Sequence, residues 1–112
     1  MKLPELTRTL TLEGPVTVPD GAGGYGKSWT VLGTLWAEVL PGTGRDRAGE
    51  DVTLSTVSYR ITVRAAPFGA PSRPVPEQRL REGSRVFRIL AVTERDDDAR
   101  YLTCFAREEE PA

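Results

Sequence analysis

The sequence predicts an all-β fold, a small β-barrel or sandwich of about six antiparallel strands joined by long loops. Several stretches alternate apolar and polar residues at every second position, as strands with one buried face do. The 112 residues include 11 glycines and 9 prolines, a composition typical of a turn-rich β protein. No stretch predicts a helix with confidence. Strands at this spacing close most simply into a barrel or sandwich, because closure removes exposed edges.

The central strand is expected at residues 29–40, WTVLGTLWAEVL. Every second residue from Trp29 to Val39 is non-polar, so this row predicts one continuous buried wall. At about 3.3 Å per residue the strand would span roughly 40 Å, which is long for a small domain. Gly33 lies mid-strand, where glycine marks a bulge or a bend, so we expect the strand to bend there and to serve two parts of a curled sheet.

Before this strand, residues 1–6 are expected to form a loose N-terminal arm, which is distinct from any later segment. Residues 7–18 alternate, but Gly14 and Pro15 are expected to interrupt the strand. Residues 19–27, PDGAGGYGK, predict a flexible loop, because glycine and Asp-Gly readily adopt positive φ.

After the central strand, residues 41–52 form a second long irregular segment. Residues 52–64 predict the cleanest half-buried strand. The proline-rich residues 65–78 are expected to be extended, with little internal hydrogen bonding. The remaining segments are short strands and turns: strands at 78–81, 85–93 and 101–107, turns at 82–83 and 95–99, and a solvated tail at 108–112.

Three long loops are unusual in a domain of this size, since loops of about a dozen structureless residues are uncommon in compact domains. We expect some of them to become ordered against other subunits.

Composition limits the possible functions of a chain expected to form a single domain over residues 1–112. The net charge is −1, whereas a free-standing nucleic-acid-binding domain is usually strongly basic. The chain has no histidine, which removes the commonest general base and metal ligand and every Ser–His or Cys–His pair. The single Cys104 excludes an internal disulfide, and its place in an alternating strand predicts a small buried hydrophobe. No enzyme activity, metal or cofactor is therefore expected.

No apolar run approaches the roughly 18 residues of a membrane span. The first residues lack the apolar core of a signal peptide, so neither membrane insertion nor export is expected.

Two acidic or glycine-rich motifs have simpler interpretations than ligand binding. Residues 21–26 match G-x-G-x-x-G, but the dinucleotide motif follows a strand and opens a helix within a βαβ unit, and that context is missing. Residues 96–98 are three aspartates without the alternating ligands of a calcium loop, so a solvated hairpin turn is expected.

The candidate functional residues are arginines and aromatics. Arg45 and Arg47 in the 41–52 loop either contact phosphates or carboxylates of a partner, or belong to an exposed loop of mixed charge. Trp29, Trp36 and Tyr59 are expected to anchor the core or an interface.

The order of several short motifs resembles the head–tail joining family of tailed phages, also called head-completion or stopper proteins. The motifs are the loop DGAGG at 20–24, the run from Trp29 to WAEV at 36–39, GR at 44–45, RITVR at 60–64 and RVFRILAV at 85–92. The preference for arginine over lysine suits a high-GC bacterial genome, so a prophage or gene transfer agent particle is as good a source as a lytic phage.

The resemblance implies a small β-barrel assembled as a ring, of six or twelve copies, in the neck of a virion formed in the bacterial cytoplasm. The ring would join the portal-bound adaptor of the DNA-filled head to a tail terminator or other tail protein. Double-stranded DNA would pass through its lumen, with the 41–52 loop as a gate and Arg45 and Arg47 nearest the DNA. The alternative is a small OB-like barrel that binds single-stranded nucleic acid or another ligand, which would need exposed aromatics on a basic face.

Overall fold

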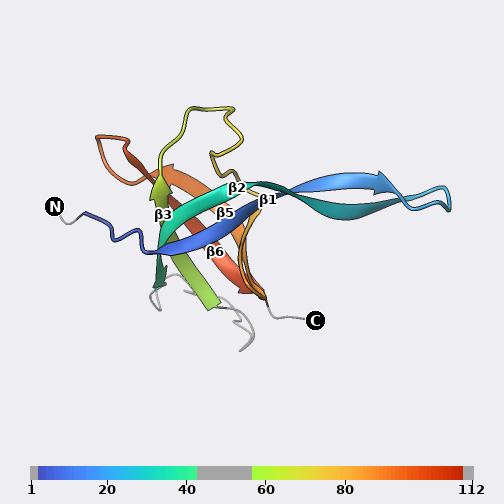
Figure 1. The fold of residues 1–112 in the computed structure, drawn as a ribbon, viewed down its shortest axis with the longest axis horizontal. Coiled ribbons are helices and arrows are strands. Elements are labelled where there is room, and N and C mark those ends of the chain that lie inside the picture. Colours follow the sequence, from blue (N-terminus) through green and yellow to red (C-terminus); the bar gives the residue numbers. More distant parts are fainter. Residues whose placement is uncertain (1–2, 43–56, 110–112) are drawn as a thin grey trace, which may run out of the picture.

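The computed structural model describes residues 3–42 and 57–109, and in these ranges every regular element is a β-strand. The all-β class and the antiparallel strands expected from the sequence are confirmed (Figure 1). The strands are β1 (Arg8–Pro19), β2 (Tyr25–Pro41), β3 (Val57–Arg64), β4 (Arg79–Glu82), β5 (Arg85–Glu94) and β6 (Tyr101–Glu109).

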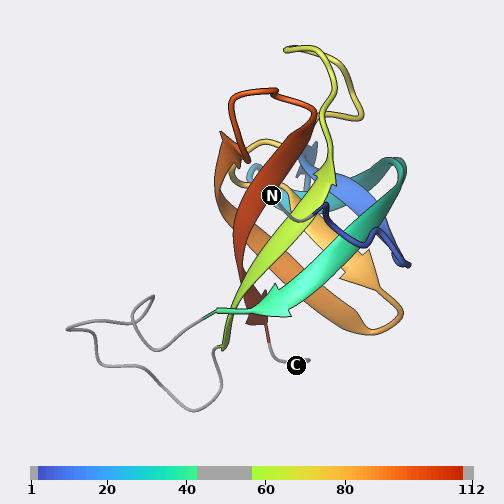
Figure 2. The ribbon, with the colours of Figure 1, turned by 90° about the vertical axis from the view of Figure 1, so that its left-hand side faces the viewer.

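The six strands form one antiparallel sheet in the order β1-β2-β3-β6-β5-β4. The sheet closes into a barrel because β4 pairs back onto β1, with Leu12 opposite Leu80. Figure 2 shows the closed ring of strands from one side. Closure pairs the edges that an open sheet would expose to other chains.

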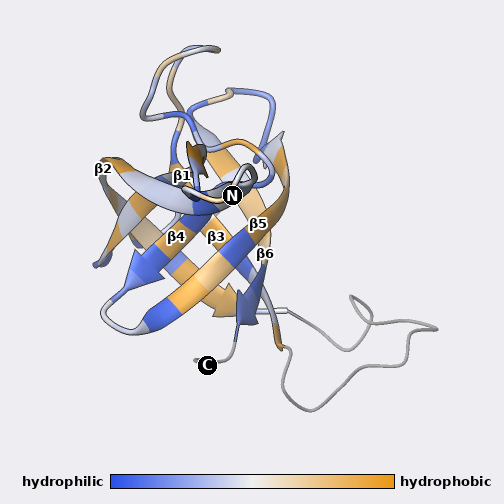
Figure 3. Ribbon diagram, turned by 90° about the vertical axis from the view of Figure 1, so that its right-hand side faces the viewer, coloured by the Kyte–Doolittle hydropathy of each residue, from blue (hydrophilic) through white to orange (hydrophobic). Residues whose placement is uncertain are grey.

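The core fills the barrel with alternate residues from all six strands. Figure 3 shows hydrophilic and hydrophobic residues alternating along the strands. This alternation is the pattern from which the strands were predicted in the sequence. The buried hydrophobic residues are Leu10, Leu12, Ala37, Ile61, Val63, Leu80, Phe87, Ile89, Leu102, Cys104 and Ala106. Each large side chain buried in this way contributes about 1.5–3 kcal/mol. Cys104 is fully buried, as its place in an alternating strand predicted.

The first two strands continue beyond the barrel as a long two-stranded ribbon, visible at the right of Figure 1. β1 pairs with β4 only as far as Glu13, whereas its pairing with β2 continues to Pro19 opposite Tyr25. We call residues 14–30 the arm. It extends along the longest dimension of a molecule that measures 54 × 35 × 24 Å.

The structure of the arm differs from two sequence-based expectations. Gly14 and Pro15 do not interrupt β1, and the expected 19–27 loop is shorter, because residues 19 and 25–27 belong to the strands. Pro15 is tolerated because β1 has only β2 as a neighbour at this point, so the missing N–H can face the unpaired edge.

The turn itself is short, at residues 20–24, and is closed by the side chain of Asp20. Its Oδ1 atom accepts hydrogen bonds from the backbone N–H groups of Ala22 (2.8 Å) and Gly24 (3.0 Å). Gly21 and Gly23 have φ of 81° and 86°, values that residues with a side chain rarely adopt.

The irregularity expected at Gly33 is present. Leu12 pairs with Gly33 and Glu13 with Val31, so Leu32 is an extra residue in β2. One extra residue reverses which side chains face inward. The prediction of a single buried wall from Trp29 to Val39 is therefore wrong. Val31 is 60% exposed, while Leu32 packs against the core.

The proline-rich segment is folded on itself, which contradicts the expected extended chain with few hydrogen bonds. Within it, Ala70 N donates to Pro67 O, Arg73 N to Ala70 O (both 3.0 Å) and Gln78 N to Val75 O (3.2 Å). Pro74 is among the fully buried side chains. Two of the three long loops are thus ordered within the subunit, and the third lies almost wholly outside the described residues.

In the two ranges that the structure covers, no helix is long or apolar enough to cross a membrane.

Candidate assembly surfaces

Residues 3–42 and 57–109 contain no group of histidine, cysteine and carboxylate side chains that could hold a metal ion. Desolvation by burial raises the pKa of the Cys104 thiol to about 12, so this sulfur is not a ready nucleophile. Arg45 and Arg47 lie outside the described residues. The notable features of the described residues are an exposed apolar face and two clusters of ion pairs.

The base of the arm carries a cluster of charged side chains around Trp29, which is half-buried. The guanidinium of Arg79 lies 4.1 Å from the centroid of the Trp29 ring, and the Lys27 ammonium lies 6.0 Å from it. Arg79 Nε also donates to Glu13 Oε1 (2.6 Å), and Arg81 Nε donates to Glu13 Oε2 (3.0 Å). We call Glu13, Trp29, Arg79 and Arg81 the base cluster.

The base cluster joins the arm to the barrel. Glu13 is 5% exposed, and a carboxylate so far from water requires charged hydrogen-bond partners. Both of its partners come from β4, and Trp29 stands on the arm strand of β2. Sequence reasoning missed this cluster, because Glu13 meets Arg79 only through the β1–β4 pairing that closes the barrel.

The opposite ends of the chain meet in a second set of ion pairs, at the barrel end where the β4–β5 turn lies. Arg85 Nε donates to Glu108 Oε2 (2.8 Å), and Arg8 Nε donates to Glu82 Oε2 (3.0 Å). These arginine hydrogen bonds lower the pKa of Glu108 and of Glu82 below the ordinary value. Glu108 was expected in a solvated tail, but β6 runs on to Glu109 and the carboxylate is ion-paired.

Tyr59 belongs to this end of the barrel. Its ring packs edge-on against Phe87, with centroids 5.2 Å apart and an interplanar angle of 79°. Its hydroxyl accepts a hydrogen bond from Arg85 Nη2 at 3.3 Å. Tyr59 thus contacts the core and a surface ion pair at once.

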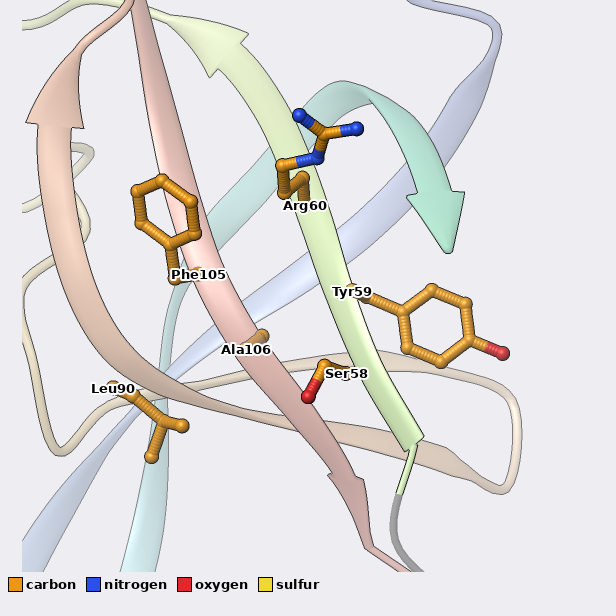
Figure 4. Close-up of a pocket in the computed structure, with 6 residues that line it drawn as sticks. All are labelled: Ser58, Tyr59, Arg60, Leu90, Phe105 and Ala106. Atoms are coloured by element: carbon orange, nitrogen blue, oxygen red, sulfur yellow. The ribbon is translucent and has the colours of Figure 1, made fainter. Parts of the chain in front are cut away.

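The outward side of β2, β3, β6 and β5, which we call the outer face, carries an exposed apolar strip. Its members are Trp36 (58% exposed), Leu90 (48%), Leu40 (44%) and Phe105 (37%). A shallow pocket of about 180 Å³ is sunk into this face (Figure 4). Its lining residues are Ser58, Tyr59, Arg60, Leu90, Phe105 and Ala106.

Beside this pocket the outer face has a second hollow, of about 340 Å³, lined mainly by polar side chains. Arg60 and Phe105 border both. Glu38 and Glu94 add negative charge to the second hollow. Exposed apolar surface on the outside of a closed barrel is typical of a protein that assembles with other proteins.

Comparison with known proteins identifies the family. The sequence profile of a family described as phage head completion protein matches residues 1–109, and the chain belongs to that family. The resemblance found in the sequence is confirmed, and with it the location of the chain in a phage-like virion.

Two solved structures share the fold. A chain from the virion of a native gene transfer agent particle superimposes with a TM-score of 0.80 and 59% sequence identity, over 98% of this chain and 100% of that one. A protein of Shigella flexneri 2a, solved in solution, superimposes with a TM-score of 0.69 and 22% identity, over 96% of each chain. The second shows the fold alone. A search of the curated proteins gives no match.

Proposed function

We propose that this protein is a head–tail connector of the stopper type. Copies form a closed ring in the neck of a gene-transfer-agent-like or phage-like particle. The ring joins the portal-bound adaptor of the DNA-filled head to the tail terminator or a neighbouring tail protein. The observation that carries the proposal is the match to a gene transfer agent virion chain at 59% identity over that whole chain, in agreement with the family match over residues 1–109.

The geometry supports assembly through side chains. Closure pairs the strands of the barrel with one another, so the free strand edges that a partner could extend lie mainly along the arm. Exposed apolar residues lie both on the arm and on the outer face. When one patch of a subunit binds a different patch of the next, a closed ring results if the rotation between copies closes, and the proposed ring has about six or twelve copies.

The charge of the chain fits a channel through which DNA moves. The net charge of −1 gives little attraction to phosphates, and a strongly basic lumen would retain the genome instead of releasing it. In this proposal the 41–52 loop, with Arg45 and Arg47, faces the lumen and helps to retain and gate the DNA. The role is structural and requires no catalytic group.

Deletion of the gene in the producing strain tests the connector role. We expect DNA-filled heads and free tails that fail to join, counted by negative-stain electron microscopy. Supplying the wild-type gene in trans restores joined particles. Joined, infectious or gene-transferring particles in the deletion strain would overturn the proposal.

The OB-like alternative makes a different prediction for the purified protein. Its aromatics would bind single-stranded DNA at low salt, and the affinity would fall as salt rises. The structure offers this reading little support, because Arg79 covers Trp29 and several arginines are paired with carboxylates. Fluorescence anisotropy with a labelled oligonucleotide distinguishes the OB-like alternative from the connector role.

A further inference from the structure

The arm presents apolar side chains to solvent on both of its faces. Val16 and Val18 are each 38% exposed on the face that continues the barrel interior. Tyr25, on the other face, is 74% exposed. The ribbon projects away from the barrel, as Figure 1 shows, so the rest of the described subunit does not cover these side chains.

The arm is held in a defined direction before it meets a partner. A two-stranded ribbon alone is only marginally stable in water. Here Glu13 and Trp29 are fixed to β4 by Arg79, through a 2.6 Å hydrogen bond and a 4.1 Å stacking distance. A binding element that is ordered in advance loses less entropy on association.

The outer-face pocket is a complementary surface on the other side of the same subunit. Leu90 and Phe105 point outward from β5 and β6, because their neighbours Ile89 and Cys104 are fully buried. Figure 4 shows Phe105 and Arg60 projecting from adjacent strands, with Leu90 nearby on β5. Figure 2 views the molecule from the left of Figure 1, with β3 and β6 in front, whereas the arm extends to the right of Figure 1.

We propose that the arm of one copy docks on the outer-face pocket of the next copy. This inference rests on the ring proposed above and names its contact surfaces. The two surfaces face opposite directions, so they cannot meet within one subunit, but they meet when copies associate head to tail. Such contacts use a different patch on each partner and run around a closed ring.

Both surfaces carry charges of both signs. The arm carries Lys27, and the outer-face hollow is lined by the carboxylates Glu38 and Glu94 and by the guanidinium groups of Arg60 and Arg95. Asp20 lies at the tip of the arm, and Arg60 borders the pocket. Opposite charges of this kind fix the orientation of partners more than they add affinity.

Site-specific photo-cross-linking in assembled particles tests the docking. Tyr25 is replaced with the photoreactive p-benzoylphenylalanine, the particles are irradiated, and cross-linked peptides are mapped by mass spectrometry. Phe68 is the matched control, since it is also aromatic and is 83% exposed, but lies on the 65–78 loop. We expect position 25 to cross-link to β5 or β6 of a second copy, and position 68 not to do so.

Two other outcomes would contradict different parts of the proposal. Cross-links from position 25 to a different part of a second copy, or to another virion protein, would overturn this interface while leaving the ring in place. Absence of any copy-to-copy cross-link from either position, in necks that also lack a ring by cryo-electron microscopy, would overturn the proposed function itself.

Charged substitutions give a second, independent test. Val18→Asp on the arm and Leu90→Asp in the pocket should each reduce the fraction of joined particles by about tenfold or more, the effect of losing some 1.4 kcal/mol. Phe68→Asp is the control and should leave joining intact. Circular dichroism and urea unfolding confirm that each variant folds. Normal joining by two folded variants, Val18→Asp and Leu90→Asp, would contradict the proposal.

Discussion

The guanidinium of Arg79 lies 4.1 Å from the centroid of the Trp29 ring, at the point where the arm leaves the barrel. The same guanidinium donates to Glu13, so one side chain of β4 contacts Trp29 of the arm and the β1 residue that precedes the arm. A long ribbon with apolar faces would otherwise move freely about its base. The contact ties the base of the arm to the barrel.

Trp29→Leu should loosen the arm and leave the barrel intact. The variant removes a cation–π contact of about 0.5–2 kcal/mol. Hydrogen exchange should become faster for amides in residues 14–19 and 25–30, and stay unchanged for the buried strands. Trp36→Leu is the matched control, because Trp36 is 58% exposed on the outer face of the same strand. Equal acceleration in both variants would show that the Trp29 contact does not hold the arm.

Glu13→Gln should destabilise the fold by about 2 kcal/mol, the scale of losing hydrogen bonds to charged groups. The variant leaves Arg79 and Arg81 facing each other without a carboxylate between them. Urea unfolding measures the change. Glu94→Gln, at an exposed position, should have almost no effect. A similar loss in both variants would contradict the role given to the buried carboxylate.

Stability should fall below about pH 4.5. The folded-state pKa values of Glu82 and Glu108 lie below the ordinary value of 4.5, so their ion pairs stabilise the fold above that pH and are lost as the pH falls through the lowered pKa values. Arg85→Leu should reduce the difference in urea midpoint between pH 6 and pH 3. The effect should be below about 1 kcal/mol, because the Arg85 side chain is 39% exposed and water screens the pair.

The exposed Arg107 provides the comparison for that experiment. Arg107→Leu should leave the pH dependence as it is in the wild type. A pH dependence unchanged by Arg85→Leu would argue against the assigned ion pair.

Cys104 should react with thiol reagents only when the barrel opens. Its side chain is fully buried and burial raises the pKa to about 12, so both access and thiolate formation are suppressed. Labelling with Ellman's reagent should be slow in buffer and fast in urea. An added cysteine in the exposed β4–β5 turn, Ser84→Cys, should label rapidly in buffer. Rapid labelling of Cys104 in the native protein would mean that β6 is not packed as described.

The barrel was predictable because its strands bury one face each. Ile61, Val63, Ile89, Leu102 and Cys104 alternate with outward residues, and this two-residue period is a local property of the chain. The irregularity at Gly33 was predicted from the mid-strand glycine, whereas the alternation across it was misleading.

The arm was not predictable by the same means. Its strands bury neither face, so residues 19–27 lack alternation and their glycines indicated a loop. The base cluster depends on β4 pairing with β1, a contact between residues 66 positions apart, as from Glu13 to Arg79. Pairing over such a distance follows from barrel closure and leaves no local signal.

The most direct test of the connector role is a cryo-electron microscopy reconstruction of the neck of the assembled particle. We expect a closed ring of copies of this barrel between the portal-bound adaptor and the tail, surrounding an axial channel. A neck that lacks this chain, or that holds it as separate copies outside the head–tail junction, would contradict the account.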